Sequence, residues 1–247
     1  LIARGAKQIR LQKDDPGPGF GTLHRAVYQE GLLALMEGRH DDADKLLREH
    51  VQLAVDAGRA KRPWTAYRYA LVAMNLIMQG GLREAEEFLS TTPTFDVLVG
   101  DPTAASSAYA RAIPWERVRL KVERGEVNEA VAAARTLEDQ DSKAWWFSVE
   151  ALRGEMLCLA GQSATGLGLL RNVVWTREAV ADPNDPALAR HRAVAGLCAL
   201  KTGELQLART LARMSRAAFA AQPGVSPYFK APLVKLERAL GLRLPAV

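Results

Sequence analysis

Five short phrases, each opened by glycine, decide the fold: GRHDDA at 38–43, GLREA at 81–85, GEVNEA at 125–130, GQSATG at 161–166 and GELQLA at 203–208. Counting Gly80 for the second phrase, the glycines recur every 36 to 45 residues. Each glycine follows one stretch of helical apolar periodicity and precedes another, and glycine is favoured where a helix ends in a left-handed residue. The repetition predicts an array of helical hairpins.

The apolar periodicity predicts which segments pair as hairpins. The expected pairs are 21–37 with 43–54, 63–78 with 82–90, 102–124 with 127–137, 142–159 with 167–180, and 187–201 with 204–221. Asp41 is the expected N-cap in the first hairpin, and Pro114 is expected to kink or divide the third. A last helix, 226–240, should cover the apolar face that the fifth hairpin leaves exposed.

The fold class that follows is all-α: an α-α superhelix, or solenoid, of about five helical hairpins with a C-terminal capping helix. Residues 1–20 include two prolines and two glycines between 11 and 20, which predicts an N-terminal tail or linker. The repeat domain is then 21–247. The loop at 91–103 carries four apolar residues and is expected to pack back onto the array, and whether it fills a binding surface is left open.

Composition limits the classes of function and the compartment. The formal charge is only +5, from 33 basic and 28 acidic residues, which is too mild for a nucleic-acid footprint. The longest apolar run, 70–78, is too short to span a bilayer, so no membrane is expected. Cys158 and Cys198 fall in apolar helical stretches, which indicates buried small hydrophobes rather than a disulfide. We therefore expect a reducing, cytoplasmic location.

Small residues in phase with the turn glycines resemble the tetratricopeptide repeat (TPR) family. That family places a small residue about seven before the turn glycine and alanine five after it. Nine of the ten positions match here, with Val118 the departure: Gly31, Ala73, Gly154 and Gly196 before the turns, and Ala43, Ala85, Ala130, Gly166 and Ala208 after them. The family period is 34 residues, so the chain resembles divergent members with longer repeats, such as those of kinesin light chain and bacterial regulators.

The resemblance implies a concave groove, lined by the first helix of each hairpin, that holds an extended peptide or a partner helix. Phase from the turn glycines carries the groove positions over to Arg25, Tyr28, Tyr67, Met74, Trp115, Arg119, Glu155 and Arg190. Aromatic and arginine side chains are typical interface anchors. The alternative for Tyr28, Tyr67 and Trp115 is packing between repeats.

Charged and titratable side chains give weaker signals. Arg117, Lys121 and Arg124 share one helical face, either as a patch for an acidic partner or as an ordinary solvated face. Interleaved glutamates would partly cancel its field, so nucleic acid is disfavoured as a partner. The four histidines are scattered among different elements without metal-ligand spacing, and no phosphate-binding loop or nucleophile motif is present in the sequence. We expect no metal, no cofactor and no enzyme.

The function that these observations favour is a protein-protein interaction module that binds a peptide or partner helix in its groove. An alternative is the regulatory or sensor domain of a larger bacterial signalling protein, a kinase or transcription regulator. The first residue is Leu1 rather than methionine, and the linker at 11–20 also favours this alternative, in which the chain is a fragment. Self-association is left open.

Overall fold

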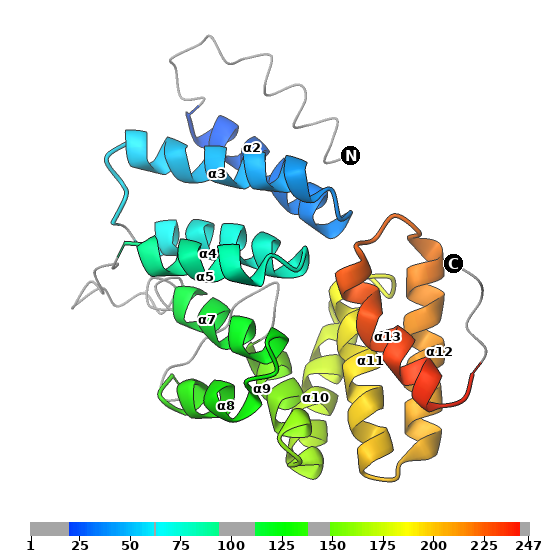
Figure 1. The fold of residues 1–247 in the computed structure, drawn as a ribbon. Coiled ribbons are helices and arrows are strands. Elements are labelled where there is room, and N and C mark those ends of the chain that lie inside the picture. Colours follow the sequence, from blue (N-terminus) through cyan, green and yellow to red (C-terminus); the bar gives the residue numbers. More distant parts are fainter. Residues whose placement is uncertain (1–19, 62, 94–111, 138–148, 243–247) are drawn as a thin grey trace. The chain divides into compact units, whose positions relative to one another are not determined.

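The computed structural model describes residues 20–61, 63–93, 112–137 and 149–242, and every regular element in these ranges is an α-helix (Figure 1). The chain divides into two compact units, residues 1–120 and 121–247. The predicted all-α fold is confirmed. The predicted boundary at residue 20 stays a prediction, because residues 1–19 lie outside the described ranges.

The first unit contains two complete hairpins. Helix α2 (Phe20–Met36) pairs with α3 (His40–Asp56), and α4 (Pro63–Met78) pairs with α5 (Leu82–Thr91), with α3 packed against α4 (Figure 1). Its core is aliphatic, with Leu35, Leu47, Leu71, Met74 and Leu89 almost completely buried. Helix α7 (Ala112–Glu123) crosses the boundary between the units.

The second unit is built around one buried helix, α11 (Pro186–Lys201), of which 13 of 16 residues are buried. Its hairpin partner is α12 (Leu205–Ala221), and the hairpin of α9 (Val149–Leu159) and α10 (Ser163–Glu178) packs on it. The shorter α8 (Val127–Arg135) packs on α9. Helix α13 (Pro227–Ala239) packs on α11 and α12, which confirms the capping helix.

All five turn glycines adopt the predicted left-handed conformation, with φ from 72° to 88°. At each turn, the residue after the glycine donates its backbone N–H to the carbonyl five residues earlier, for example Arg39 to Ala34 at 2.9 Å and Glu204 to Ala199 at 2.8 Å. This bond is the mark of a Schellman turn, which satisfies carbonyls at the helix end. Gly58 and Gly241 end α3 and α13 in the same way, and the repeat pattern did not predict these two.

The small positions permit close helix contacts. A methyl group on Gly154 would lie 2.7 Å from Leu170 Cγ, and one on Gly166 would lie 2.6 Å from the Gly154 carbonyl oxygen. In the next hairpin the nearest atom to such a methyl on Gly196 belongs to Leu236 of α13. The small residues before and after the turn glycines therefore allow two kinds of close contact. Gly154 and Gly166 allow one within a hairpin, and Gly196 allows one with the capping helix.

Two helices that begin with proline have side-chain caps, whereas the cap predicted at Asp41 is wrong. The Asp185 carboxylate accepts backbone N–H bonds from Ala187 at 2.7 Å and Leu188 at 3.2 Å, and Ser226 caps α13. Helix α3 begins at His40, so Asp41 lies in its first turn and caps nothing. A carboxylate there still interacts favourably with the helix dipole.

The cysteine prediction is half right. Cys158 and Cys198 are buried, 5% and 0% exposed, but they form a disulfide that joins α9 to α11. Their Cα atoms lie 5.7 Å apart, within the range for a bridge. The pairing depends on the packing of two first helices 40 residues apart in sequence, which helical periodicity does not report. No helix in the described ranges is long and apolar enough to cross a membrane.

Candidate functional site

Two of the predicted groove residues lie side by side in the first unit. Tyr28 on α2 and Tyr67 on α4 place their hydroxyl oxygens 3.4 Å apart and their ring centroids 6.4 Å apart. Both residues are half-buried. Arg25 lies one turn before Tyr28 and is exposed. The first helices of two consecutive hairpins therefore contribute to one aromatic surface.

A pair of histidines packs against this surface. The rings of His24 and His50 meet edge-on with centroids 5.4 Å apart, and the Tyr28 ring lies 5.3 Å from that of His50. Burial, with a smaller effect of the Arg68 charge, lowers the pKa of His24 to about 4 and that of His50 to about 3. Both imidazoles are therefore neutral near pH 7.

The sequence places these two histidines on different helices and does not show that their rings meet. His24 and His50 belong to the two arms of one hairpin, and the crossing of α2 and α3 decides that they meet. The spacing of His24 and Tyr28, four residues apart on one helical face, is the available sequence signal. Arg68 anchors the cluster by donating from Nη1 to the His50 carbonyl oxygen at 3.1 Å. Burial, then the charge of Arg59, lowers the Arg68 pKa to about 10, which leaves it cationic at neutral pH.

His40 is held separately by Asn75, the polar residue inside the apolar helix α4. The Asn75 amide donates from Nδ2 to the His40 carbonyl at 3.0 Å, and its Oδ1 lies 2.9 Å from His40 Nδ1. Because Oδ1 can only accept, His40 must carry a proton on Nδ1. Asn75 is fully buried and fixes the start of α3. This asparagine is therefore structural.

The remaining groove positions of the first unit are buried. Met74, Trp115 and Arg119 are 2%, 5% and 6% exposed. Arg119 donates from Nε to Glu116 at 3.0 Å; burial raises the pKa of that carboxyl, and the Arg119 charge opposes the rise. In this structure these side chains hold the unit together, and the packing alternative fits Trp115 better than a partner contact does.

In the second unit, Glu155 and Arg190 form a closed ion pair between α9 and α11. Arg190 donates two bonds to Glu155, at 2.9 and 3.2 Å, and lies 3.9 Å from Glu123. Its guanidinium also covers the ring of Tyr228 on α13, 4.8 Å from the centroid. Burial, the largest single effect, lowers the pKa of Arg190, but the charges of Glu155, Tyr228 and Glu123 and the hydrogen bond to Glu155 together outweigh it, and the net pKa is raised. Tyr228 was missed because only the docking of α13 brings it here.

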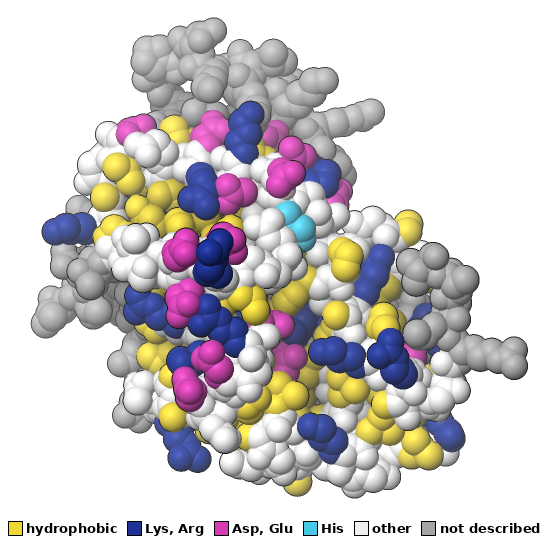
Figure 2. Space-filling view, in the orientation of Figure 1, with side chains coloured by type: hydrophobic (Ala, Val, Ile, Leu, Met, Phe, Trp, Pro, Cys, Tyr) yellow, Lys and Arg dark blue, Asp and Glu magenta, His cyan; other side chains and the backbone are white. Residues whose placement is uncertain are grey.

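The predicted basic face is largely engaged within the chain. Arg117 donates to the Leu89 carbonyl at 2.9 Å. Lys121 binds Glu129 at 2.7 Å and Glu126 at 3.4 Å, and Arg124 lies 4.0 Å from Glu126. Over α3 and α5, acidic and basic side chains are likewise intermingled (Figure 2). The charges therefore form mixed pairs in these places rather than a uniform basic field. Of the 91–103 loop, residues 94–103 lie outside the described ranges.

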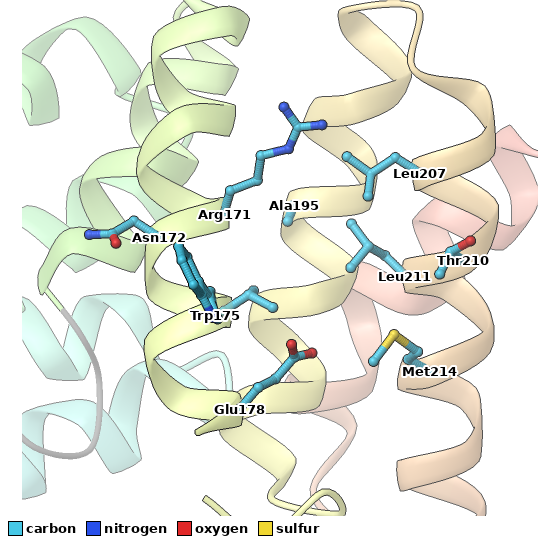
Figure 3. A pocket seen from close by; sticks show the side chains of 10 residues that line it. Arg171, Asn172, Trp175, Glu178, Ala195, Leu207, Thr210, Leu211 and Met214 are labelled. Atoms are coloured by element: carbon cyan, nitrogen blue, oxygen red, sulfur yellow. The ribbon is translucent and has the colours of Figure 1, made fainter. Parts of the chain in front are cut away.

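The second unit also has an open apolar groove that the sequence did not reveal. It occupies about 550 Å³ between α10 and α12, with Ala195 of α11 on its floor (Figure 3). Trp175 lines one wall although 76% of its surface is exposed, and Leu207, Leu211 and Met214 line the other. In the described ranges, no group of three or more His, Cys, Asp or Glu side chains could hold a metal ion.

These features agree with a helical-repeat architecture: left-handed turn glycines, small residues at the helix contacts and a capping helix. The fold is TPR-like. No known family profile matches the chain, and no curated protein matches it.

Among solved structures, two of a putative kinesin light chain from Podosopora anserina, with nearly identical TPR-like repeats, align with the chain at 19% identity. One, a glutamine-to-methionine variant, covers 81% of this chain and 95% of its own with a TM-score of 0.45. The other covers 80% and 96% with a TM-score of 0.44. Similarity at this level has no bearing on function.

Proposed function

We propose that this chain is a protein-interaction module that binds a peptide segment or partner helix on the first helices of its hairpins. The observation that carries the proposal is the Tyr28–Tyr67 pair, in which consecutive first helices present two half-buried rings with adjacent hydroxyls. Tyrosine offers a large apolar contact at low cost in side-chain entropy, together with a polar group that gives direction.

The surroundings of the pair support a preformed surface. The His50 ring packs against that of Tyr28, His24 packs against His50, and Arg68 is tied to the α3 backbone. Tyr28 therefore rests on a rigid support, which reduces the entropy lost on binding. Arg25, exposed one turn from Tyr28, provides a cation for an acidic residue of the ligand. The preferred ligand is then an apolar or aromatic peptide with a nearby carboxylate.

A selection from a random peptide library displayed on phage tests this proposal and does not require the natural partner. Enriched peptides are synthesised, and their dissociation constants are measured by fluorescence polarisation. The Tyr28→Ala, Tyr67→Ala double variant should bind them at least about tenfold more weakly, the loss typical of an interface anchor. Phenylalanine at both positions separates the contribution of the hydroxyls from that of the rings.

Tyr69→Ala is the matched control. Tyr69 lies two residues after Tyr67 on the same helix, so it points to the other side, where its ring packs 5.9 Å from Phe88. This variant should bind the selected peptides as wild type does, while the circular dichroism of all variants stays helical. Enriched peptides that bind the double variant and wild type equally, or a selection that enriches none, would refute the proposal.

A further inference from the structure

A second surface, on α10 in the second unit, carries an exposed stripe of three residues. Arg171, Trp175 and Glu178 follow one another at spacings of four and three, which places them on one face of the helix. All three are exposed, with 76% of Trp175 in solvent. Tryptophan is usually highly buried in a monomer and is enriched at the centre of interfaces. Trp175, at the centre of the stripe, is therefore much more exposed to solvent than is usual for a tryptophan.

The groove beside the stripe can receive a large apolar side chain. Its α12 wall consists of Leu207, Leu211 and Met214, again at helical spacing, and Ala195 leaves space at the floor (Figure 3). Met214 remains 37% exposed. An open apolar groove next to a protruding indole has the shape and chemistry to accept a copy of that indole.

The charges on the stripe identify the occupant. Arg171 and Glu178 are seven residues apart, about 10.5 Å along the helix, with Trp175 near their midpoint. If a second α10 packs antiparallel around that midpoint, each arginine faces the glutamate of the other copy. A two-fold interface needs this kind of self-complementarity, because the same patch occurs on both sides. The simplest surface that complements a cation and an anion on either side of an indole is the same face of α10 in a second copy of the chain.

We propose that a second copy of this chain docks on α10 and the groove between α10 and α12, forming a two-fold symmetric homodimer. In it, Arg171 pairs with the partner's Glu178, Glu178 pairs with the partner's Arg171, and the partner's Trp175 enters the groove. The apolar contact supplies most of the affinity, and the two ion pairs set the antiparallel register. This surface is separate from the Tyr28–Tyr67 surface, so either proposal can fail alone.

Existing ion pairs do not block this contact. Arg171 binds Glu204, and Glu178 binds Arg192 at 3.0 Å. The Arg171 side chain is nevertheless 51% exposed and that of Glu178 is 34% exposed, so each keeps free surface for a further partner. Association extends two local pairs into a network rather than burying an isolated charge.

Sedimentation velocity across a range of protein concentrations tests the dimer. Wild type should pass from monomer to dimer as its concentration rises, and Trp175→Ala should raise the dissociation constant at least about tenfold. Leu159→Ala is the control: Leu159 is also an exposed apolar residue of the second unit, at 48%, but it does not line the groove. Its dissociation constant should match that of wild type.

Charge reversal tests the register. R171E alone places two carboxylates opposite each other at both contacts, and E178R alone places two cations there, so each variant should self-associate more weakly than wild type. A mixture of the two restores opposite charges at both contacts and should form a heterodimer. Thermal melting checks that each variant is folded, since E178R also removes the partner of Arg192.

Three results would overturn the proposal. The first is a wild type that stays monomeric at every concentration, which would leave the groove to a helix of another protein. The second is self-association that Trp175→Ala does not weaken. The third is a mixture of folded R171E and E178R chains that associates no better than either chain alone.

Discussion

Replacing Gly166 by alanine should destabilise the second unit, although alanine is the better helix former. The added methyl carbon would lie 2.6 Å from the Gly154 carbonyl oxygen, 2.7 Å from Cys158 Sγ and 2.9 Å from the Cys158 backbone nitrogen. Two of these three atoms are backbone, and all belong to α9. Relief of the overlap therefore requires α9 and α10 to separate, which loosens a packed helix contact.

The same helix supplies a control, because Gly168 is exposed and an added methyl carbon there would meet nothing within 4 Å. Gly168→Ala should raise the unfolding free energy by about 0.5–1 kcal/mol through helix propensity alone. Gly166→Ala has the same propensity gain, but overpacking costs about 1–3 kcal/mol, with contacts this short at the upper end. The propensity gains cancel, so the two variants should differ by about 3 kcal/mol, or about 6–12 °C in Tm.

Thermal and urea unfolding followed by far-UV circular dichroism would measure this difference. Both variants change glycine to alanine two positions apart, so their unfolded states are closely matched. If Gly166→Ala melts at or above wild type, helices α9 and α10 are not in close contact at this position. If Gly168→Ala is as destabilising as Gly166→Ala, the effect does not come from that contact.

Two further predictions concern the histidine pair and the disulfide. The folded pKa values of His24 and His50, about 4 and about 3, lie below the ordinary 6.5, so the unfolded chain binds more protons as the pH falls and stability is lost below about pH 6.5. His50→Phe should reduce the loss between pH 7 and pH 5 by about 2 kcal/mol in urea titrations, and an unchanged pH dependence would contradict the buried, neutral histidine. Reduction of Cys158–Cys198, which are 40 residues apart, should lower the unfolding free energy by about 4 kcal/mol if loop-closure entropy dominates. The Cys158→Ala, Cys198→Ala variant should not respond to reductant, and a wild type that is equally indifferent would refute the cross-link.

The hairpins could be predicted from the sequence because their signals are local. A Schellman turn involves six consecutive residues, so Gly38 or Gly203 marks a helix end whatever the rest of the chain does. Asp185 and Ser226 act through neighbouring backbone N–H groups and were recognisable for the same reason. Apolar periodicity identified the capping helix and placed the described helix ends within three residues of their observed positions, except that α10 begins four residues earlier than expected. The expected helix starts at 102 and 142 lie outside the described ranges.

The residues that helical phase assigned to a groove have different surroundings in the structure, and their role in binding stays a prediction. Helical phase placed Tyr28 and Tyr67 on facing first helices, and the structure brings them together. The same phase selected Met74 and Trp115, but it does not report how deeply a neighbouring helix covers a side chain. Arg190 illustrates the same limit, because α13 lays Tyr228 beneath its guanidinium.

The sequence by itself determined the helices and their turns, since each depends on interactions within one hairpin or less. Only the tertiary structure decided that His24 meets His50, that Cys158 meets Cys198, and that Trp175 stands beside an open groove. These outcomes depend on how helices distant in sequence cross and how much surface they leave uncovered. The crossings arise from the packing of many side chains together, and no short stretch of sequence contains that information.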